Sequence, residues 1–570
     1  MTMNPQRRLL NRRRPIAWAA ALTALAGPAQ AFQFDTPEDW SIRWDNTVRA
    51  STKYRLQPAD PALSQTFIGG NPANDPQAAN FNAGDQNFQD RGIFSERLDL
   101  LSEFDAVWRR DFGLRVSGAG WYDHKIRGTT QATDVFNGQA PYNEFTEQTR
   151  RRAGRKAEVL DAFVFGGWRL GPETKLTARL GRHGLQYGES LFFGDNGIAR
   201  AQGPIDIDKL LAAPGVQFKE IIRPVPQVSS QLQLGSDLSV GGYYQFRWEE
   251  DRIPAPGTYF SSSNNGWGTT MNEVVGLKNP PPDPPTVFSL APGGDIKPKD
   301  SGQYGLQLKY RAAGTDYGLY YARYHDKAGQ IFGRLDSTGA PNAFGQLPGQ
   351  WYFKFPEGIR TWGVSASRSV GTFNLAGEAS IRQNMPLRSG NMLWNIPIPG
   401  TTITTPEPQY ATGKTAHVNF SWLATLDPNF LSQETSFLGE LAWHRVLSVN
   451  DPDRQLDTTR TRDATAIRMI FSPSYRQVLP GLDVSVPVGL GYTLQGQSAI
   501  SAGWASKNSG DLSVGLEGNY LGVWQMGLNY THYIGKAIPF VTYTTNPPTY
   551  STGQPLADRD FISLSVRRTF

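Results

Sequence analysis

The chain has 570 residues, contains no cysteine and carries a formal net charge of +5. The lack of cysteine excludes disulfides, cysteine-ligated zinc and thiol catalysis. The basic excess lies in residues 1–31, which hold five arginines and no acidic residue, so residues 32–570 are formally neutral. Their charge gives no reason to expect nucleic-acid binding.

Residues 1–31 predict a secretory signal peptide. Five arginines between Arg7 and Arg14 precede the apolar run "IAWAAALTALAG", and the small-residue site "AQA" ends at Ala31. This order of basic, apolar and small residues is typical of an export signal. A single membrane anchor is the alternative, but the apolar run is shorter than the ~20 residues that a spanning helix needs. We therefore expect cleavage after Ala31 and one exported domain over residues 32–570.

The first element after this signal is a long amphipathic strand over residues 40–56, "WSIRWDNTVRASTKYRL". Its even positions are mostly apolar or aromatic and its odd positions are polar, a period of two that is typical of a strand. The segment is much longer than the ~5–6 residues of an ordinary strand. A tilted strand crosses a bilayer with ~9–11 residues, so this one can cross and project beyond an interface.

The same alternation recurs along the whole exported domain. Candidate strands lie near 40–56, 97–109, 114–124, 156–169, 174–184, 227–234, 238–250, 302–311, 316–326, 359–370, 373–384, 414–426, 435–447, 463–476, 482–493, 511–520, 523–533 and 559–570. Their apolar faces are aliphatic in the middle and aromatic toward an end. A lipid-facing band between aromatic girdles has this pattern.

The connections between these strands alternate between short and long. Short ones include "RDFG", "LGPE" and "GSD", and long ones include 57–96, 125–155, 185–226 and 251–301. Outer-membrane barrels have even strand numbers, short periplasmic turns and long extracellular loops. The sequence therefore predicts an all-β fold, a transmembrane antiparallel β-barrel of about 18 strands in the lipid of a Gram-negative outer membrane. A soluble sandwich would explain single amphipathic strands but not 18 with terminal aromatics.

One long connection, residues 185–226, has the wrong composition for a solvated loop. Its many leucine, isoleucine and phenylalanine side chains need burial. Irregular backbone is tolerated at membrane depth inside a barrel, so we expect this segment to fold inward as a constriction. The residues expected near the path are Tyr187, Glu189, Phe192 and Phe193, with Arg43 and Arg49 on the lumen wall. An apolar cap over the barrel mouth is the alternative.

The sequence contains no motif for catalysis. It has no Gly-x-Ser-x-Gly and no His-Glu-x-x-His pattern, and its six histidines lie in or beside predicted strands. Stretches rich in oxygen ligands, such as "GDNG" at 194–197, lack the EF-hand spacing and are typical of turns. We therefore expect no enzyme activity, no metal site and no cofactor.

Several stretches are similar to one family of Gram-negative exported proteins. "WDNTVRASTKYRL", "LGRHGLQYGESLFFGDNGI" at 180–198, "PGVQFKEIIRPVP" at 214–226 and "GYYQFRWEEDRIPAPGTYFSSSN" at 242–264 resemble the domain of unknown function 1302 family. Tyr187 stands where the family usually has tryptophan before Gly-Glu-Ser. The resemblance implies an outer-membrane location. It also implies two partners, a periplasmic lipid-carrier-like protein and an inner-membrane exporter of the resistance-nodulation-division type.

Two functions remain for a barrel of this kind. One is a conduit that moves a hydrophobic or amphiphilic molecule across the outer membrane with envelope partners. The other is a substrate-selective porin for a small hydrophilic solute such as an organic anion. An 18-stranded barrel is wide enough for an aqueous channel, so strand number does not separate them. Basic and acidic residues share the polar faces, and this mixed lining, together with the resemblance, favours the conduit.

Overall fold

The computed structural model describes residues 32–34, 36–64, 80–133, 141–215, 218–264, 273–277, 286–336, 339–389, 394–395, 410–450, 456–500, 504–542 and 549–570. The predicted signal peptide lies outside these residues.

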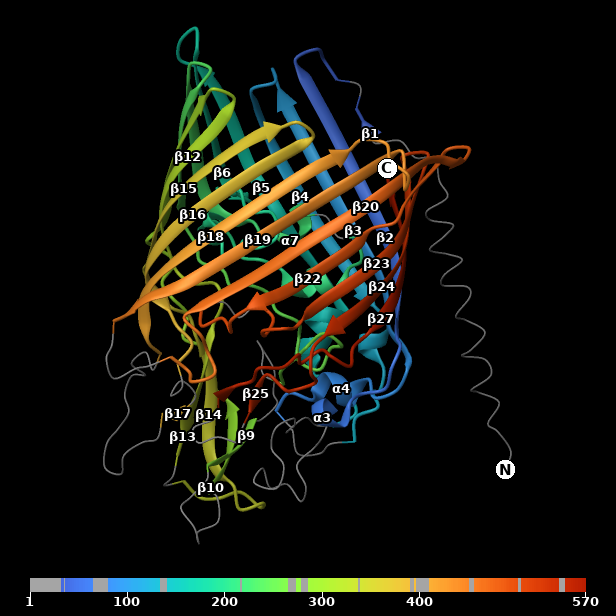
Figure 1. The fold of residues 1–570 in the computed structure, drawn as a ribbon, viewed down its shortest axis with the longest axis vertical. Coiled ribbons are helices and arrows are strands. Elements are labelled where there is room, and N and C mark those ends of the chain that lie inside the picture. Colours follow the sequence, from blue (N-terminus) through green and yellow to red (C-terminus); the bar gives the residue numbers. More distant parts are fainter. Residues whose placement is uncertain are drawn as a thin grey trace.

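Eighteen antiparallel strand positions close into one barrel (Figure 1). The strands are β2 (Trp40–Arg55), β3 (Gly92–Trp108), β4 (Phe112–Asp123), β5 (Arg155–Arg169), β6 (Thr174–His183), β7 (Val225–Leu234), β8 (Leu238–Gln245), β11 (Gln303–Ala312), β12 (Thr315–Tyr324), β15 (Ile359–Val370), β16 (Phe373–Pro386), β18 (Thr412–Leu426), β19 (Glu434–Val449), β20 (Asp463–Leu479), β21 (Leu482–Ser485) with β22 (Val488–Gln495), β23 (Gly510–Tyr520), β24 (Trp524–Ile534) and β27 (Phe561–Thr569). β21 and β22 share one position, and the short β1 (Phe32–Gln33) only pairs beside β2.

Every strand predicted from the sequence is present, which confirms the predicted fold class. The barrel closes because β2 pairs with both β3 and β27, so this sheet has no free edge. The one internal difference is at 482–493, where the predicted strand is interrupted between β21 and β22.

Successive side chains along each strand point alternately to lipid and to the barrel interior. On β3, Leu98 and Leu100 are 43% and 46% exposed, whereas Arg97 and Asp99 between them are buried. Exposed leucines, valines and aromatics recur on the outer faces of the other strands. A continuous apolar outer surface around a polar interior is the surface of an outer-membrane barrel, embedded in lipid.

The two ends of the barrel differ. Short turns such as 109–111, 235–237 and 313–314 join the strands at one end, where the chain also ends (Figure 1). The long connections gather at the opposite end. By the rule for outer-membrane barrels, the short-turn end is periplasmic and the long-loop end is extracellular.

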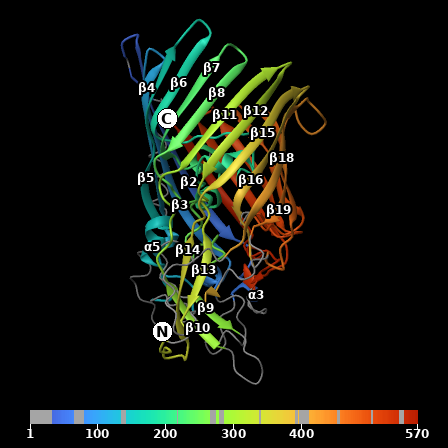
Figure 2. The ribbon, with the colours of Figure 1, turned by 90° about the vertical axis from the view of Figure 1, so that its left-hand side faces the viewer.

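The long loops also build a second, five-stranded sheet, which the sequence analysis missed. It contains β9 (Glu273–Leu277), β10 (Thr286–Pro292), β13 (Gln330–Leu335), β14 (Leu347–Lys354) and β17 (Trp394–Asn395), from three different loops. Figure 2 shows it extending beyond the long-loop end of the barrel. Its core includes Phe288, Leu290, Phe332, Leu335 and Trp351. β25 (Val541–Thr542) and β26 (Thr549–Tyr550) form a separate pair.

The helices are short: α3 (Pro61–Ser64), α4 (Ala83–Asn87), α5 (Glu147–Thr149), α6 (Ile207–Ala212) and α7 (Phe218–Ile221). Three single turns are η2 (Lys125–Arg127), η3 (Arg150–Gly154) and η4 (Ile198–Ala201). None of the helices in the described ranges is long and apolar enough to cross a membrane.

Candidate functional site: a segment across the barrel lumen

The connection between β6 and β7 turns into the barrel over its described residues, 184–215 and 218–224. Its contacts reach lumen-facing side chains of β16, β18 and β19 on one side and of β2 on another. None of these strands neighbours β6 or β7 in the wall. The segment therefore spans the lumen, and α7 is visible inside the barrel in Figure 1. We call residues 184–215 and 218–224 the lumen segment.

Two wall carboxylates hold the first part of this segment. Glu440 of β19 accepts hydrogen bonds from the backbone N–H groups of Leu191 (3.1 Å), Phe192 and Phe193 (2.8 Å). Glu378 of β16 accepts from the N–H groups of Glu189 (2.6 Å) and Ile198 (2.9 Å). Consecutive N–H groups that converge on one carboxylate form a concave anion site, and charge-assisted bonds of this kind are strong.

A buried polar network holds the next turn. The Asn196 amide donates to Asn419 Oδ1 (2.7 Å) and accepts at Oδ1 from His417 Nδ1 (2.8 Å) and His444 Nδ1 (3.2 Å). Arg382 of β16 donates to the carbonyls of residues 195–197 over 2.6–2.9 Å. Because these bonds come from side chains of three strands, β16, β18 and β19, this turn is fixed against the wall.

The far part of the segment is tied to β2. Arg49 Nη2 lies 2.8 Å from Glu220 Oε1, and Lys209 Nζ lies 3.2 Å from the other oxygen of the same carboxylate. Lys53 Nζ donates to the carbonyl of Leu211 (2.6 Å). These groups are buried, so Glu220, rather than water, compensates the charges of Arg49 and Lys209.

Further ion pairs fasten the segment toward the long-loop end. Arg200 bridges Asp251 (2.7 Å) and Asp326 (2.6 Å), and Arg252 bridges Asp206 (2.5 Å) and Glu158 (2.6 Å).

Asp208 in α6 is a buried acid close to these pairs. Burial raises the pKa of the Asp208 carboxyl to about 6, and the nearby charge of Asp206 acts in the same direction.

The structure places the four residues predicted near the path in different surroundings. Tyr187 is 4% exposed and packs against Tyr243 and Tyr320, with ring centroids 5.5 and 6.2 Å apart. It is a packing residue and lines no open path. Glu189 points toward Lys309 of β11, with Nζ and Oε1 3.7 Å apart.

Phe192 and Phe193 lie in the same turn but make different contacts. The Phe193 ring lies 5.3 Å from that of Trp504 and packs on buried alanines of β19 and β20. Phe192 is partly exposed, and its N–H binds Glu440. Both side chains are partly exposed, and Phe193 is the one that packs against the aromatic ring of Trp504.

The two predicted wall arginines also differ. Arg49 is buried against Glu220, so it anchors the segment instead of lining a passage. The Arg43 side chain is 56% exposed near the short-turn end and pairs with Asp45 (2.9 Å) and Asp105 (3.6 Å). Its charge is compensated on the wall.

Other lumen-wall arginines are compensated in the same way. Arg115 pairs with Glu103 and with Asp105 (3.1 Å), and Arg182 pairs with Glu249 (2.5 Å). Arg468 of β20 pairs with Asp511 of β23. At each of these positions a carboxylate therefore balances the positive charge of the arginine.

An apolar patch interrupts the polar wall on β18, β19 and β20. Leu423 pairs in register with Leu438, and Leu438 with Ile470. Each lies two residues beyond a lumen-facing residue, Ser421, Glu440 or Arg468, and therefore points inward. Leu423 is 45% exposed and the other two are partly exposed. We call Leu423, Leu438 and Ile470 the wall patch. Polar residues ordinarily line the inside of such barrels, so an exposed apolar patch marks a contact surface.

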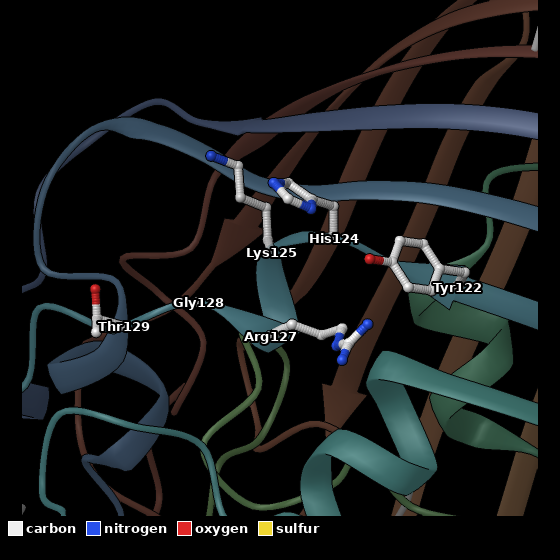
Figure 3. Close-up of a pocket in the computed structure, with 6 residues that line it drawn as sticks. All are labelled: Tyr122, His124, Lys125, Arg127, Gly128 and Thr129. Atoms are coloured by element: carbon white, nitrogen blue, oxygen red, sulfur yellow. The ribbon is translucent and has the colours of Figure 1, made fainter. Parts of the chain in front are cut away.

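A separate pocket lies at the outer rim. It has a volume of about 490 Å³ and is lined by Tyr122, His124, Lys125, Arg127, Gly128 and Thr129 (Figure 3). The Arg127 guanidinium lies 5.8 Å from the Tyr122 ring. Tyr122 is on the lipid-facing side of β4, so this pocket lies outside the lumen.

The anchors Glu378, Glu440, Asn196, Arg382, His417 and His444 were not singled out from the sequence. All of them except Asn196 lie on the polar faces of strands. A solvated wall residue and an anchor give the same alternating sequence pattern there. The only available signal was their chemistry. Carboxylate side chains in the middle of a strand are rarely buried unless another group pairs with them.

Comparison with known proteins gives a family and distant structural likenesses. No curated protein matches the chain. The barrel is similar to OccAB4 of Acinetobacter baumannii (9% identity, 95% of this chain and 99% of that one, TM-score 0.39) and OccK9 of Pseudomonas aeruginosa (10%, 94% and 98%, TM-score 0.38). It is also similar to OmpF of Salmonella typhi in complex with daunomycin (9%, 93% and 98%, TM-score 0.34). The family model described as protein of unknown function DUF1302 matches residues 12–570, and the chain belongs to that family.

Proposed function

We propose that this outer-membrane barrel is a conduit for a hydrophobic or amphiphilic molecule and has no catalytic role. The observation that carries the proposal is the wall patch of Leu423, Leu438 and Ile470 on the inner surface of the barrel. Apolar area exposed to water is costly, at about 25 cal/mol per Å², and a hydrocarbon ligand would cover it.

The lumen segment supports the same proposal. It is tied to opposite walls by buried ion pairs and charge-assisted bonds. Held in this position, the segment obstructs a wide water-filled passage. Glu440, its main anchor, is two residues from Leu438 on the same face. A ligand on the wall patch would therefore lie beside the turn that carries Phe192.

Partners at the periplasmic face are part of the proposal. Phe430, in the turn between β18 and β19, is 95% exposed. Leu479, at the end of β20, and Leu521, in the turn between β23 and β24, are also exposed. Leu521 contacts the Leu479 turn through a bond from its N–H to the Gly481 carbonyl (2.8 Å). Apolar side chains gathered on adjacent turns suit a protein contact. A periplasmic lipid-carrier-like protein, fed by an inner-membrane exporter of the resistance-nodulation-division type, fits this position.

A substrate-selective porin for a small organic anion is the second candidate. The exposed guanidinium of Arg43 at the short-turn end favours it. Its pairing with Asp45 and Asp105 weakens the attraction for an external anion.

Planar lipid bilayers and ligand extraction test the two candidates together. The conduit should show little steady conductance, and the purified protein should release a hydrophobic compound on organic extraction followed by mass spectrometry. Large, steady conductance with clear ion selectivity and no retained compound would establish the porin instead.

A further inference from the structure

The wall contains one place where two prolines interrupt neighbouring strands. Pro473 lies within β20, and Pro487 lies between β21 and β22. The register runs unchanged from Phe471↔Val488 to Ser474↔Ser485, which sets Pro473 opposite Val486 and Ser472 opposite Pro487. Every strand of a closed barrel has two neighbours, so neither proline lies on an edge, where sheets ordinarily confine this residue.

Each proline removes one hydrogen bond from the ladder. The Val486 N–H donates to the Pro473 carbonyl (3.0 Å), but Pro473 has no N–H to return to Val486. The Gly515 N–H donates to the Pro487 carbonyl (2.8 Å), and again no bond returns. Residues 486 and 487 are therefore held by one bond on each side, where a hydrogen-bonded antiparallel pair has two.

The lumen-facing side chains at the two prolines are small. Ser472, Ser485 and Gly489 share the lumen-facing parity of their strands, and Gly515 lies against Pro487. Nearer the turn, the register between β20 and β21 shifts between Tyr475 and Leu479. Few large side chains would therefore need to move if the two strands separated here.

The wall patch adjoins this place directly. Ile470 of the patch pairs in register with Gly489, and the next residue, Phe471, pairs with Val488 on the lipid-facing side. A hydrocarbon chain on Leu438 and Ile470 would lie one residue row from the two prolines, with bilayer lipid beyond them. We call the pairing of residues 471–475 with 484–488 the proline seam.

We propose that the proline seam separates locally and lets the hydrocarbon part of a lumen-bound amphiphile pass sideways into the bilayer. This inference rests on the proposed conduit and adds the route by which the cargo leaves or enters the lumen. The bond that Pro473 cannot make lowers the cost of separating β20 from residues 484–488, and the bond that Pro487 cannot make loosens the same residues from β23. The wall patch delivers the cargo to the inner side of the seam.

The absence of cysteine allows a clean test. Ser474 and Ser485 are directly opposite across the seam and belong to a non-hydrogen-bonded pair, because the neighbouring pair 473/486 carries the ladder bond. Such pairs bring Cα atoms to ~4.5 Å, within the range of a disulfide. The variant Ser474→Cys/Ser485→Cys should lock the seam when oxidised.

The matched control lies in another strand pairing of the same wall, between β2 and β27. Ser51 and Ser565 are directly opposite between β2 and β27, on the same lumen-facing side. Asn46 and Phe570 exchange both backbone bonds in that ladder, so Ser51 and Ser565 also form a non-hydrogen-bonded pair. The variant Ser51→Cys/Ser565→Cys locks an intact pairing.

The probe is pyrene-labelled hexadecanoate, preloaded on protein in nanodiscs whose brominated phospholipid quenches pyrene. Oxidised Ser474→Cys/Ser485→Cys should release the probe about tenfold more slowly than the parent, and dithiothreitol should restore the rate. The oxidised control should match the parent. Release at the parent rate from the locked seam would overturn the lateral route while leaving the conduit in place.

A parent protein that never retains the probe would contradict the conduit itself. Hydrogen exchange then still decides whether the seam opens. Peptides covering 484–488 should exchange about tenfold faster than those covering 48–52, because bonds are missing only in the former. Equal protection of the two would overturn the seam.

Discussion

The Glu440 carboxylate accepts a hydrogen bond of 2.8 Å from the backbone N–H of Phe193, which belongs to a segment that leaves the wall between β6 and β7. The same carboxylate receives the N–H groups of Leu191 and Phe192. One side chain of β19 thus holds a whole turn of the lumen segment in place.

Removing this carboxylate should loosen the segment. We expect Glu440→Ala to raise single-channel conductance, because three buried N–H groups lose their acceptor and the turn leaves the wall. Glu434→Ala is the control, since Glu434 lies on the same face of β19 but pairs with Arg476 near the short turn. If both variants conduct like the parent in planar bilayers, Glu440 is not what keeps the segment in the lumen.

Deletion of Asp195 to Ala213 tests the obstruction itself. This stretch contains the contacts with Arg382, His417 and Lys53. A deletion variant that inserts normally should conduct far more than the parent. Insertion is checked by altered gel migration of the unboiled protein, since a closed barrel resists detergent. Unchanged conductance in a properly inserted variant would show that the segment does not limit the passage.

Asp208→Asn should change the pH dependence of stability. The pKa of Asp208 is raised to about 6 by burial, so its protonated form favours the folded state at low pH. That contribution is lost as pH rises toward 6, and the ionised group then costs up to about 3 kcal/mol. The variant should therefore unfold at higher denaturant concentration than the parent at pH 8 and at a similar one at pH 4.

The exposed turn residue Asp427 provides the control for this experiment. Asp427→Asn should give a difference that is constant with pH. Destabilisation of Asp208→Asn at pH 8 would mean that the ionised carboxylate is needed as a counter-charge for Lys53 or Arg97.

Arg559 should matter far more to stability than a surface arginine. It is fully buried and pairs with Asp85 (2.7 Å), which also binds Arg55 (3.1 Å), so it joins two long loops to β2. Arg559→Ala leaves Asp85 partly uncompensated and should cost about 3–5 kcal/mol in unfolding free energy. Arg445→Ala, which breaks the exposed pair with Asp463, should cost about 1 kcal/mol or less. Similar losses in urea titrations would contradict this difference.

The barrel could be predicted because a single rule, the alternation of faces, acts on every strand. The inward position of the lumen segment was predicted from apolar residues that an exposed loop could not bury. Its anchors could not be predicted, since Glu378 and Glu440 follow the same alternation as any wetted wall residue. The five-stranded sheet was missed because its strands come from three loops and include the parallel pair β10–β14, which no local pattern indicates.

The binding of an amphiphile to the wall patch tests the proposed conduit most directly. Titration calorimetry with hexadecanoate should give saturable binding to the parent and at least about tenfold weaker binding to Leu438→Asn, because the substitution places an amide in the hydrocarbon contact. Ser436→Asn changes the next lumen-facing residue of β19 and should bind like the parent. Equal affinity in all three proteins, or no binding to any of them, would contradict the account.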